Sequence, residues 1–435
     1  MITWIDWTIW LIYFAVIFTV LWFYRHSKYD NDTYKWFLKG FLIKVLGSVA
    51  FALIFVYYYH FGDSFEYFKG AVMLSNAFLD SPSDYFELLL HESSTNFPGH
   101  LRQYTNPLAY SDSPEEWFMV KMISPLALIT FNSYLAINLC MATISFWGSW
   151  KLFKVFSTIL PSKKNLVFLA AFLIPSMVFW GSGLMKDTLT LAGINYMIYA
   201  LYFTLIKKKF KPIFIIGVII WFYITFTLKS YIVIAFLPTV FLVYYYNYKS
   251  KIKSQIIRVI STPLIILIFI TIGFFSLKAL SESSNKYSAK QLEYKAKGFH
   301  SWHTSLGGST YNLGEVEYTI IGALKKTPAA LNATFFRPYL WEAKNPVVFL
   351  GALESLALLI IFLIVLYKTR LKPLKILKHT ILLKSLVAFI MIFGFAVGFT
   401  SYNFGALGRY KMPVMSLFTF ILIYILSKRP HNKNS

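Results

Sequence analysis

Long apolar stretches alternate with short polar connections along most of the chain. Each stretch approaches the roughly 20 residues that a helix needs to cross a bilayer. Hydrocarbon forces backbone polar groups to pair within their own segment, so the stretches predict helices. The pattern therefore predicts an all-α, polytopic helical membrane protein with about eleven transmembrane helices. The predicted spans are Thr3–Phe23, Trp36–Tyr59, Phe118–Trp150, Leu166–Gly183, Leu189–Ile206, Pro212–Thr227, Tyr231–Asn247, Ile256–Leu280, Pro346–Tyr367, Thr380–Phe399 and Pro413–Ser427.

Lysine and arginine residues gather on every second connection between these spans. Short loops rich in Lys and Arg stay in the cytoplasm. This predicts an amino terminus outside and a carboxyl terminus inside, in a bacterial inner membrane. The basic clusters fall within residues 25–35, 151–164, 207–211, 249–253, 368–378 and 428–429.

The composition supports one integral membrane domain over residues 1–435, with 57% hydrophobic and 14% charged residues. The net charge of +23 does not indicate nucleic-acid binding, because most of the basic residues are those of the topological clusters. These lysines face anionic membrane lipids. The single cysteine, Cys140, falls inside a predicted span and excludes a disulfide framework or a cysteine-based metal site.

Two connections, residues 60–117 and 281–345, are far longer than the others, and both fall on the predicted outer side. Long loops in compact folds are usually functional. Their spaced apolar residues favour amphipathic helices on the bilayer surface. We therefore expect the chemistry at the outer membrane face.

The first long loop carries two acids, Asp63 and Glu66, directly after an aromatic segment. Three residues apart, they share one face of a helix. Such a pair suits a general base, or a site for a divalent cation such as Mg²⁺ or Mn²⁺. Alternatively, Asp63 caps a juxtamembrane helix. The two interpretations are compatible.

A second candidate lies after Gly181-Ser182-Gly183, where Lys186 and Asp187 begin a span. Asp187 near a helix N-terminus is ordinary capping chemistry. The positive charge of Lys186 is unfavourable at a helix N-terminus by itself. It becomes favourable when a phosphate or carboxylate binds there to the free N–H groups.

Further outer connections contribute ionisable and aromatic residues. Lys229 lies in a tight turn, where snorkelling to the interface is the alternative explanation. Arg337, Trp341 and Glu342 form either an interfacial anchor or a platform for sugar and phosphate. Glu354 lies at membrane depth, where an ionisable group usually faces a cavity or a partner.

The last outer turn adds Arg409 and Lys411 beside two glycines, and Arg offers a planar fork for phosphate oxygens. Positive charge on this side runs against the topological bias. The predicted phosphate ligands are therefore Lys186, Lys229, Arg337, Arg409 and Lys411. We expect them to line one cavity for a lipid-linked phosphate or diphosphate.

An acid just after a span, loop helices and about eleven spans together resemble the GT-C-type glycosyltransferases. The Pro175–Asp187 segment is similar to the middle of that superfamily. The Gly408–Pro413 and Arg337–Glu342 stretches resemble O-antigen-polymerase-like proteins of surface-polysaccharide synthesis. The resemblance implies an enzyme that transfers sugar from a polyprenyl-phosphate carrier, with Asp63 as base or metal ligand and Glu66 as its partner.

The leading hypothesis is a membrane glycosyltransferase that moves a sugar from a polyprenyl-phosphate-linked donor to a glycan or lipid acceptor. The close alternative is a repeat-unit polymerase or ligase acting on polyprenyl-diphosphate-linked glycans, in which Arg409 and Lys411 dominate. A third is a non-enzymatic transporter of lipid-linked glycans, which would need a polar pathway through the spans. The large loops on one side favour chemistry over transport.

Overall fold

The computed structural model describes residues 2–28, 31–94, 96–106, 108–249, 254, 309–314 and 320–428. The predicted all-α class is confirmed over these ranges, where an isolated bridge between Thr310 and Asn403 is the one β contact. The chain divides into two compact units. Unit 1 comprises Met1–Ala200 and Lys211–Val233, and unit 2 comprises Leu201–Phe210 and Ile234–Ser435.

The membrane character is supported by long apolar helices. Within the described residues, six helices are long and apolar enough to cross a bilayer, or up to eight if each of two bent pairs is one span. The six are Trp4–His26, Asp32–Tyr59, Lys186–Ile206, Pro212–Lys249, Pro346–Lys368 and Ile381–Thr400. The predicted span Ile256–Leu280 and much of the predicted loop 281–345 lie outside the described residues.

Two predicted spans are interrupted. Phe118–Trp150 is divided between α6 (Pro114–Ile129) and α7 (Tyr134–Ile159), which meet at 116°. Phe131 and Asn132 turn the chain with positive φ angles, a conformation that the local composition does not announce. The stretch Leu166–Gly183 contains two short helices, α8 (Lys164–Phe172) and α9 (Pro175–Phe179), because Pro175 begins a new helix.

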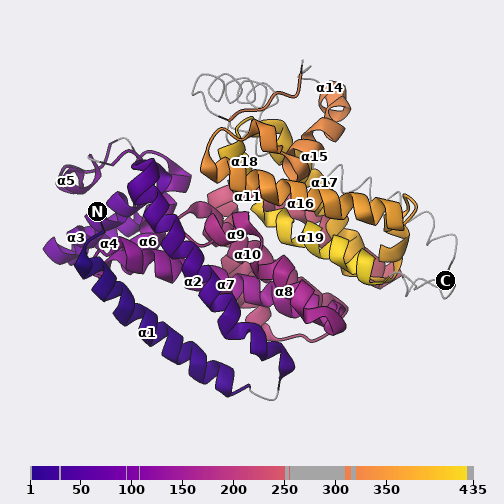
Figure 1. Cartoon of the computed structure of the whole chain (residues 1–435). Helices are drawn as coiled ribbons and strands as arrows, with labels where there is room; N and C mark the ends of the chain where they lie inside the picture. Colours follow the sequence, from indigo (N-terminus) through magenta and orange to yellow (C-terminus); the bar gives the residue numbers. More distant parts are fainter. Residues whose placement is uncertain are drawn as a thin grey trace. The chain divides into compact units, whose positions relative to one another are not determined.

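Unit 1 contains three long helices that lie side by side, α1 (Trp4–His26), α2 (Phe37–Ile54) and α7 (Figure 1). The first long loop supplies α3 (Asp63–Asp80), α4 (Pro82–Leu90) and α5 (Arg102–Thr105), and α3 packs on α6. Shorter helical turns are η1 (Asp32–Trp36), the π-helical η2 (Phe55–Tyr59), η3 (Gly99–Leu101) and η4 (Pro161–Lys163).

The helices α10 (Lys186–Leu201) and α11 (Pro212–Lys249) follow. The first part of α11 packs closely on α10 in unit 1. Gly193 permits this approach, since a Cβ there would lie 2.2 Å from the Thr225 hydroxyl. The backbone of α11 leaves the helical conformation at Lys229, with φ −151° and ψ 74°. The break falls at the position of the predicted turn, and Pro212–Lys249 counts as one candidate span where the sequence predicted two.

Unit 2 is built from α15 (Thr327–Phe336), α16 (Pro346–Lys368), α17 (Ile381–Thr400) and α19 (Met412–Ser427) (Figure 1). Small residues let α15 approach α17, and Thr334 donates to the Gly394 carbonyl at 2.6 Å. Its shorter elements are the π-helical η5 (Tyr202–Ile206), α14 (Ile320–Lys325), η7 (Leu340–Glu342), η8 (Pro373–His379) and α18 (Phe404–Tyr410).

Candidate functional site

The turn between α2 and α3 places Asp63 at the start of α3. His60 has φ +62°, and Gly62, the N-cap residue, has φ +123°. A side chain at Gly62 would be strained in that conformation. Asp63 is therefore the first helical residue and shares the first turn with Glu66, where carboxylates complement the helix dipole. The alternative prediction that Asp63 caps this helix is wrong, because Gly62 occupies the N-cap position and no side chain makes a capping hydrogen bond.

Two tyrosines, Tyr67 and Tyr110, lie near Asp63. The Tyr110 hydroxyl donates to Asp63 Oδ1 at 3.0 Å, and its ring lies 5.5 Å from the ring of Tyr67. Burial raises the pKa of Tyr110, and the nearby Asp63 carboxylate raises it further. A neutral phenol is thereby favoured as the donor to the carboxylate.

Two ion pairs complete the same region. Lys186 pairs with Glu116 of α6, and Lys229 Nζ lies 2.5 Å from Asp187 Oδ1. Both side chains of the second pair are at least nine-tenths buried.

Tyr67 connects these groups. It is 1% exposed, and burial raises its pKa. The carboxylates of Asp63, Glu116 and Asp187 lie close enough to raise that pKa further. We call this assembly the Tyr67 cluster. Its members are Asp63, Tyr67, Tyr110, Glu116, Lys186, Asp187 and Lys229.

The turn before α10 explains how Lys186 and Asp187 reach the cluster. Gly183 lies against the Phe51 ring, where a Cβ would come within 2.2 Å of a ring carbon. Asn138 of α7 accepts a hydrogen bond from the Leu184 backbone N–H at 2.8 Å. These contacts fix the backbone immediately before Lys186, so α10 begins in a defined place.

Lys44 of α2 supports the same segment from the other side. It is 1% exposed, and its Nζ donates to the carbonyls of Met177 at 2.9 Å and Gly181 at 3.1 Å. The lysine thus satisfies carbonyl groups left open where α9 ends. The sequence carries a signal for this contact, because Lys44 lies inside the predicted second span, where a basic residue needs a polar partner.

The predicted residues of unit 2 form a different arrangement. Arg337 Nε donates to both carboxylate oxygens of Glu342, at 3.1 and 3.0 Å. The guanidinium carbon lies 5.2 Å from the ring centre of Tyr311 and 5.5 Å from that of Phe404. Arg337 therefore makes a two-pronged ion pair with Glu342 and cation–π contacts with the surrounding aromatic rings.

The other candidates of unit 2 lie on nearby helices of the same unit. Lys411 is 2% exposed, and its Nζ lies 3.8 Å from Glu354 Oε1 and 3.4 Å from the Ser355 hydroxyl. Glu354, predicted at membrane depth, is likewise buried. Trp341 is exposed, and the Arg409 guanidinium carbon lies 5.5 Å from the Tyr410 ring centre.

The structure thus brings Asp63, Lys186, Asp187 and Lys229 together in unit 1. Arg337 and Glu342, and Lys411 and Glu354, form pairs in unit 2. A single cavity lined by Asp63, Lys186, Arg337 and Arg409 would draw on both units and stays a prediction, as do the phosphate-binding roles. Sequence reasoning missed Tyr67, Tyr110 and Glu116.

Within the described ranges, no group of three or more His, Cys, Asp or Glu side chains is arranged to hold a metal ion. Asp63 and Glu66 remain the predicted pair for a divalent cation, and they share the first turn of α3.

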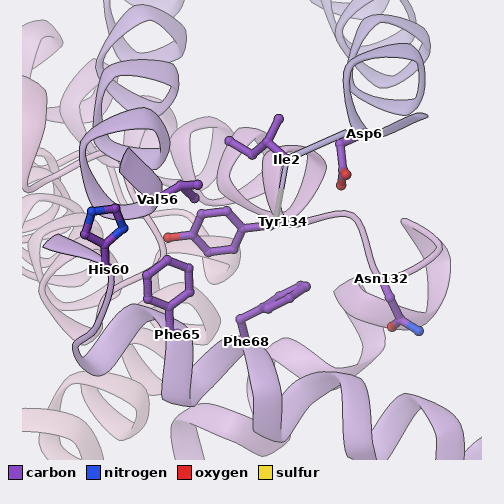
Figure 2. A pocket seen from close by; sticks show the side chains of 8 residues that line it. All are labelled: Ile2, Asp6, Val56, His60, Phe65, Phe68, Asn132 and Tyr134. Atoms are coloured by element: carbon purple, nitrogen blue, oxygen red, sulfur yellow. The ribbon is translucent and has the colours of Figure 1, made fainter. Parts of the chain in front are cut away.

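A cavity of about 370 Å³ lies beside the same turn of α3. Figure 2 shows Phe65, Phe68 and Tyr134 at its centre, with His60 on one side and Asp6 and Asn132 on the other. Its walls come from α1, the end of η2, α3, and the turn into α7.

Comparison with known proteins returns no match, whether to a family model, to a curated protein or to a solved structure.

Proposed function

We propose that this protein is a membrane glycosyltransferase that moves a sugar from a polyprenyl-phosphate-linked donor to a glycan or lipid acceptor in cell-surface polysaccharide synthesis. The reaction takes place at the outer face of a bacterial inner membrane. The amino terminus lies outside and the carboxyl terminus inside, as the lysine distribution indicates.

The observation that carries this proposal is the Tyr67 cluster. Chain segments far apart in sequence bring Asp63, Glu116 and Asp187 near the buried Tyr67, and Lys186 pairs with Glu116. Burying charged groups is costly unless they are paired, so such a cluster needs a reason to persist. Polar and charged groups gathered beside a cavity are typical of functional sites.

The residues divide the chemical work between base and cations. Asp63 takes the proton of the acceptor hydroxyl as its oxygen attacks the anomeric carbon, while Tyr110 holds the carboxylate in place. The bond from that carbon to the phosphate oxygen breaks, and the carrier phosphate leaves with its electron pair. An ammonium has three N–H donors, so Lys186 can bind Glu116 and a phosphate oxygen together.

The direct test is Asp63→Asn, which keeps the shape and removes the base. We expect glycan transfer to fall by about 10²–10⁴-fold, the usual contribution of a general base, while membrane insertion stays normal. Asp80→Asn is the matched control, because Asp80 is an exposed acid at the other end of α3. Wild-type transfer by Asp63→Asn would remove Asp63 from the mechanism.

A repeat-unit polymerase or ligase is the second candidate, and Lys411 favours it. The Lys411 ammonium, 3.8 Å from Glu354 Oε1, would bind a diphosphate oxygen together with Arg409. Glycans of a deletion strain separate the two functions. Single complete repeat units indicate a polymerase, and truncated repeat units indicate a transferase.

A further inference from the structure

The cavity of Figure 2 and the Tyr67 cluster share the first turn of α3. Phe65 and Phe68 line the cavity, while Asp63 and Tyr67 belong to the cluster. Residues three or four apart share a helix face, so the two pairs mark two faces of the first two turns of α3. Ser64, between them, is hydrogen-bonded to the Tyr134 hydroxyl of the cavity wall at 2.7 Å.

The centre of the cavity is aromatic. The rings of Phe65 and Tyr134 stack with centres 5.4 Å apart, and Phe68 meets Tyr134 edge-on at 5.2 Å. The faces of such rings carry partial negative charge. They attract the weakly positive C–H groups on the flat face of a sugar ring.

The rim of the cavity is polar. Asp6, His60 and Asn132 contribute a carboxylate, an imidazole and an amide. The buried Asn132 Oδ1 has no hydrogen-bond partner within the described structure, and Asp6 Oδ1 accepts a bond from the Ser133 hydroxyl at 2.9 Å. A sugar hydroxyl can both donate and accept, so it suits this mixture of groups.

Other occupants fit less well. None of the eight described residues that line the cavity is Lys or Arg, and one is an acid, so a phosphate would meet repulsion. A hydrocarbon chain would cover the exposed His60 imidazole without offering it a hydrogen bond, which is unfavourable. The volume suits a small polar ligand, since ligand pockets begin at about 300 Å³.

We propose that this cavity binds a neutral sugar ring of the acceptor glycan. The inference rests on the proposed transferase function. It adds that the acceptor and the donor phosphate bind in separate parts of the site. The acceptor glycan lies against the aromatic face of α3, and the donor phosphate lies towards Lys186.

The test measures sugar binding directly. Full-length protein in nanodiscs is mixed with the methyl glycosides of glucose, galactose, mannose and N-acetylglucosamine, and saturation-transfer NMR is recorded. We expect at least one glycoside to bind through its ring protons. Phe68→Leu keeps an apolar side chain but removes the ring, and we expect it to weaken binding about tenfold. Phe61→Leu is the matched control, because Phe61 is exposed and lies outside the lining.

Two results would overturn the inference: no glycoside binds, or Phe68→Leu binds as well as Phe61→Leu. Displacement of bound glycoside by phosphate, or uptake of the isoprenoid alcohol farnesol in place of any glycoside, would also overturn it. Asp63→Asn is expected to keep glycoside binding while transfer is lost. The two proposals therefore fail separately, one by the binding signal and the other by transfer.

Discussion

The two units handle their buried charges in different ways. In unit 2 the buried charges form separate pairs, Arg337 with Glu342 five residues further along the chain and Lys411 with Glu354. In unit 1, Asp63, Glu116 and Asp187 come from three different helices and gather around Tyr67. A local forked pair stabilises a turn, whereas a cluster assembled from distant segments concentrates groups able to do chemistry. This difference is our reason for placing the proposed reactive centre in unit 1.

The largest effect is expected when the buried ion pair between Lys229 and Asp187 in unit 1 is disrupted. Lys229→Met leaves the Asp187 carboxylate without its ammonium, and loss of one partner from a buried pair costs about 3–5 kcal/mol. We expect a corresponding loss in the free energy of unfolding, measured in mixed micelles. Lys229→Met combined with Asp187→Leu should regain most of the stability but not the transfer activity. A single variant as stable as wild type would contradict the pairing.

Lys186 tests whether the cluster does chemistry. We expect Lys186→Met to reduce transfer about 10–100-fold, or roughly 1.4–2.7 kcal/mol of transition-state stabilisation. Stability should change less than for Lys229→Met, because the Lys186–Glu116 pair is more exposed. Lys69→Met, an exposed lysine on α3, is the matched control. Equal transfer by the two variants would exclude Lys186 from the reaction.

Arg337 tests the other side of the comparison. Arg337→Lys keeps the charge but loses the fork that binds both oxygens of Glu342. We expect unfolding to become easier by about 1–2 kcal/mol, with transfer per folded molecule unchanged. A tenfold fall in transfer at unchanged stability would instead make Arg337 a phosphate ligand, as the sequence predicted.

The smallest effect is expected at Tyr110. Tyr110→Phe removes one hydrogen bond to Asp63 and should lower transfer by roughly threefold to tenfold, in line with about 1 kcal/mol. The raised pKa values of Tyr67 and Tyr110 favour their neutral forms in the folded protein. Their contribution to stability is complete below about pH 10 and is lost as pH rises above it. Melting temperatures between about pH 7 and 11 should fall less steeply at the alkaline end for Tyr110→Phe.

The helical class follows from the long apolar stretches, but the breaks within them do not. Phe131 and Asn132 adopt left-handed backbone without glycine, so the bend between α6 and α7 has little signal in the sequence. Pro175 does carry a signal, because the residue before a proline avoids helical conformation. The apolar stretch around Pro175 continues without interruption, so hydropathy alone predicts one span there.

The site shows a similar division. Asp63, Lys186, Asp187 and Lys229 stand out because charges are rare beside apolar spans on the predicted outer side. Tyr67, Tyr110 and Glu116 do not, since the chain contains 30 tyrosines and Glu116 is one of several acids in its loop. Their importance comes from the packing of α3 on α6, which depends on contacts between distant segments.

The contact between Lys44 and the segment before α10 has a consequence for how substrates arrive. Sliding this segment along α2 would strip the Lys44 nitrogen from two carbonyl oxygens in an apolar interior. The backbone just before Lys186 is thereby anchored, so in the proposed transferase a lipid carrier would have to reach a Lys186 whose position is fixed. Substrate selection in that enzyme would then depend on access to Lys186 and not on movement of this segment.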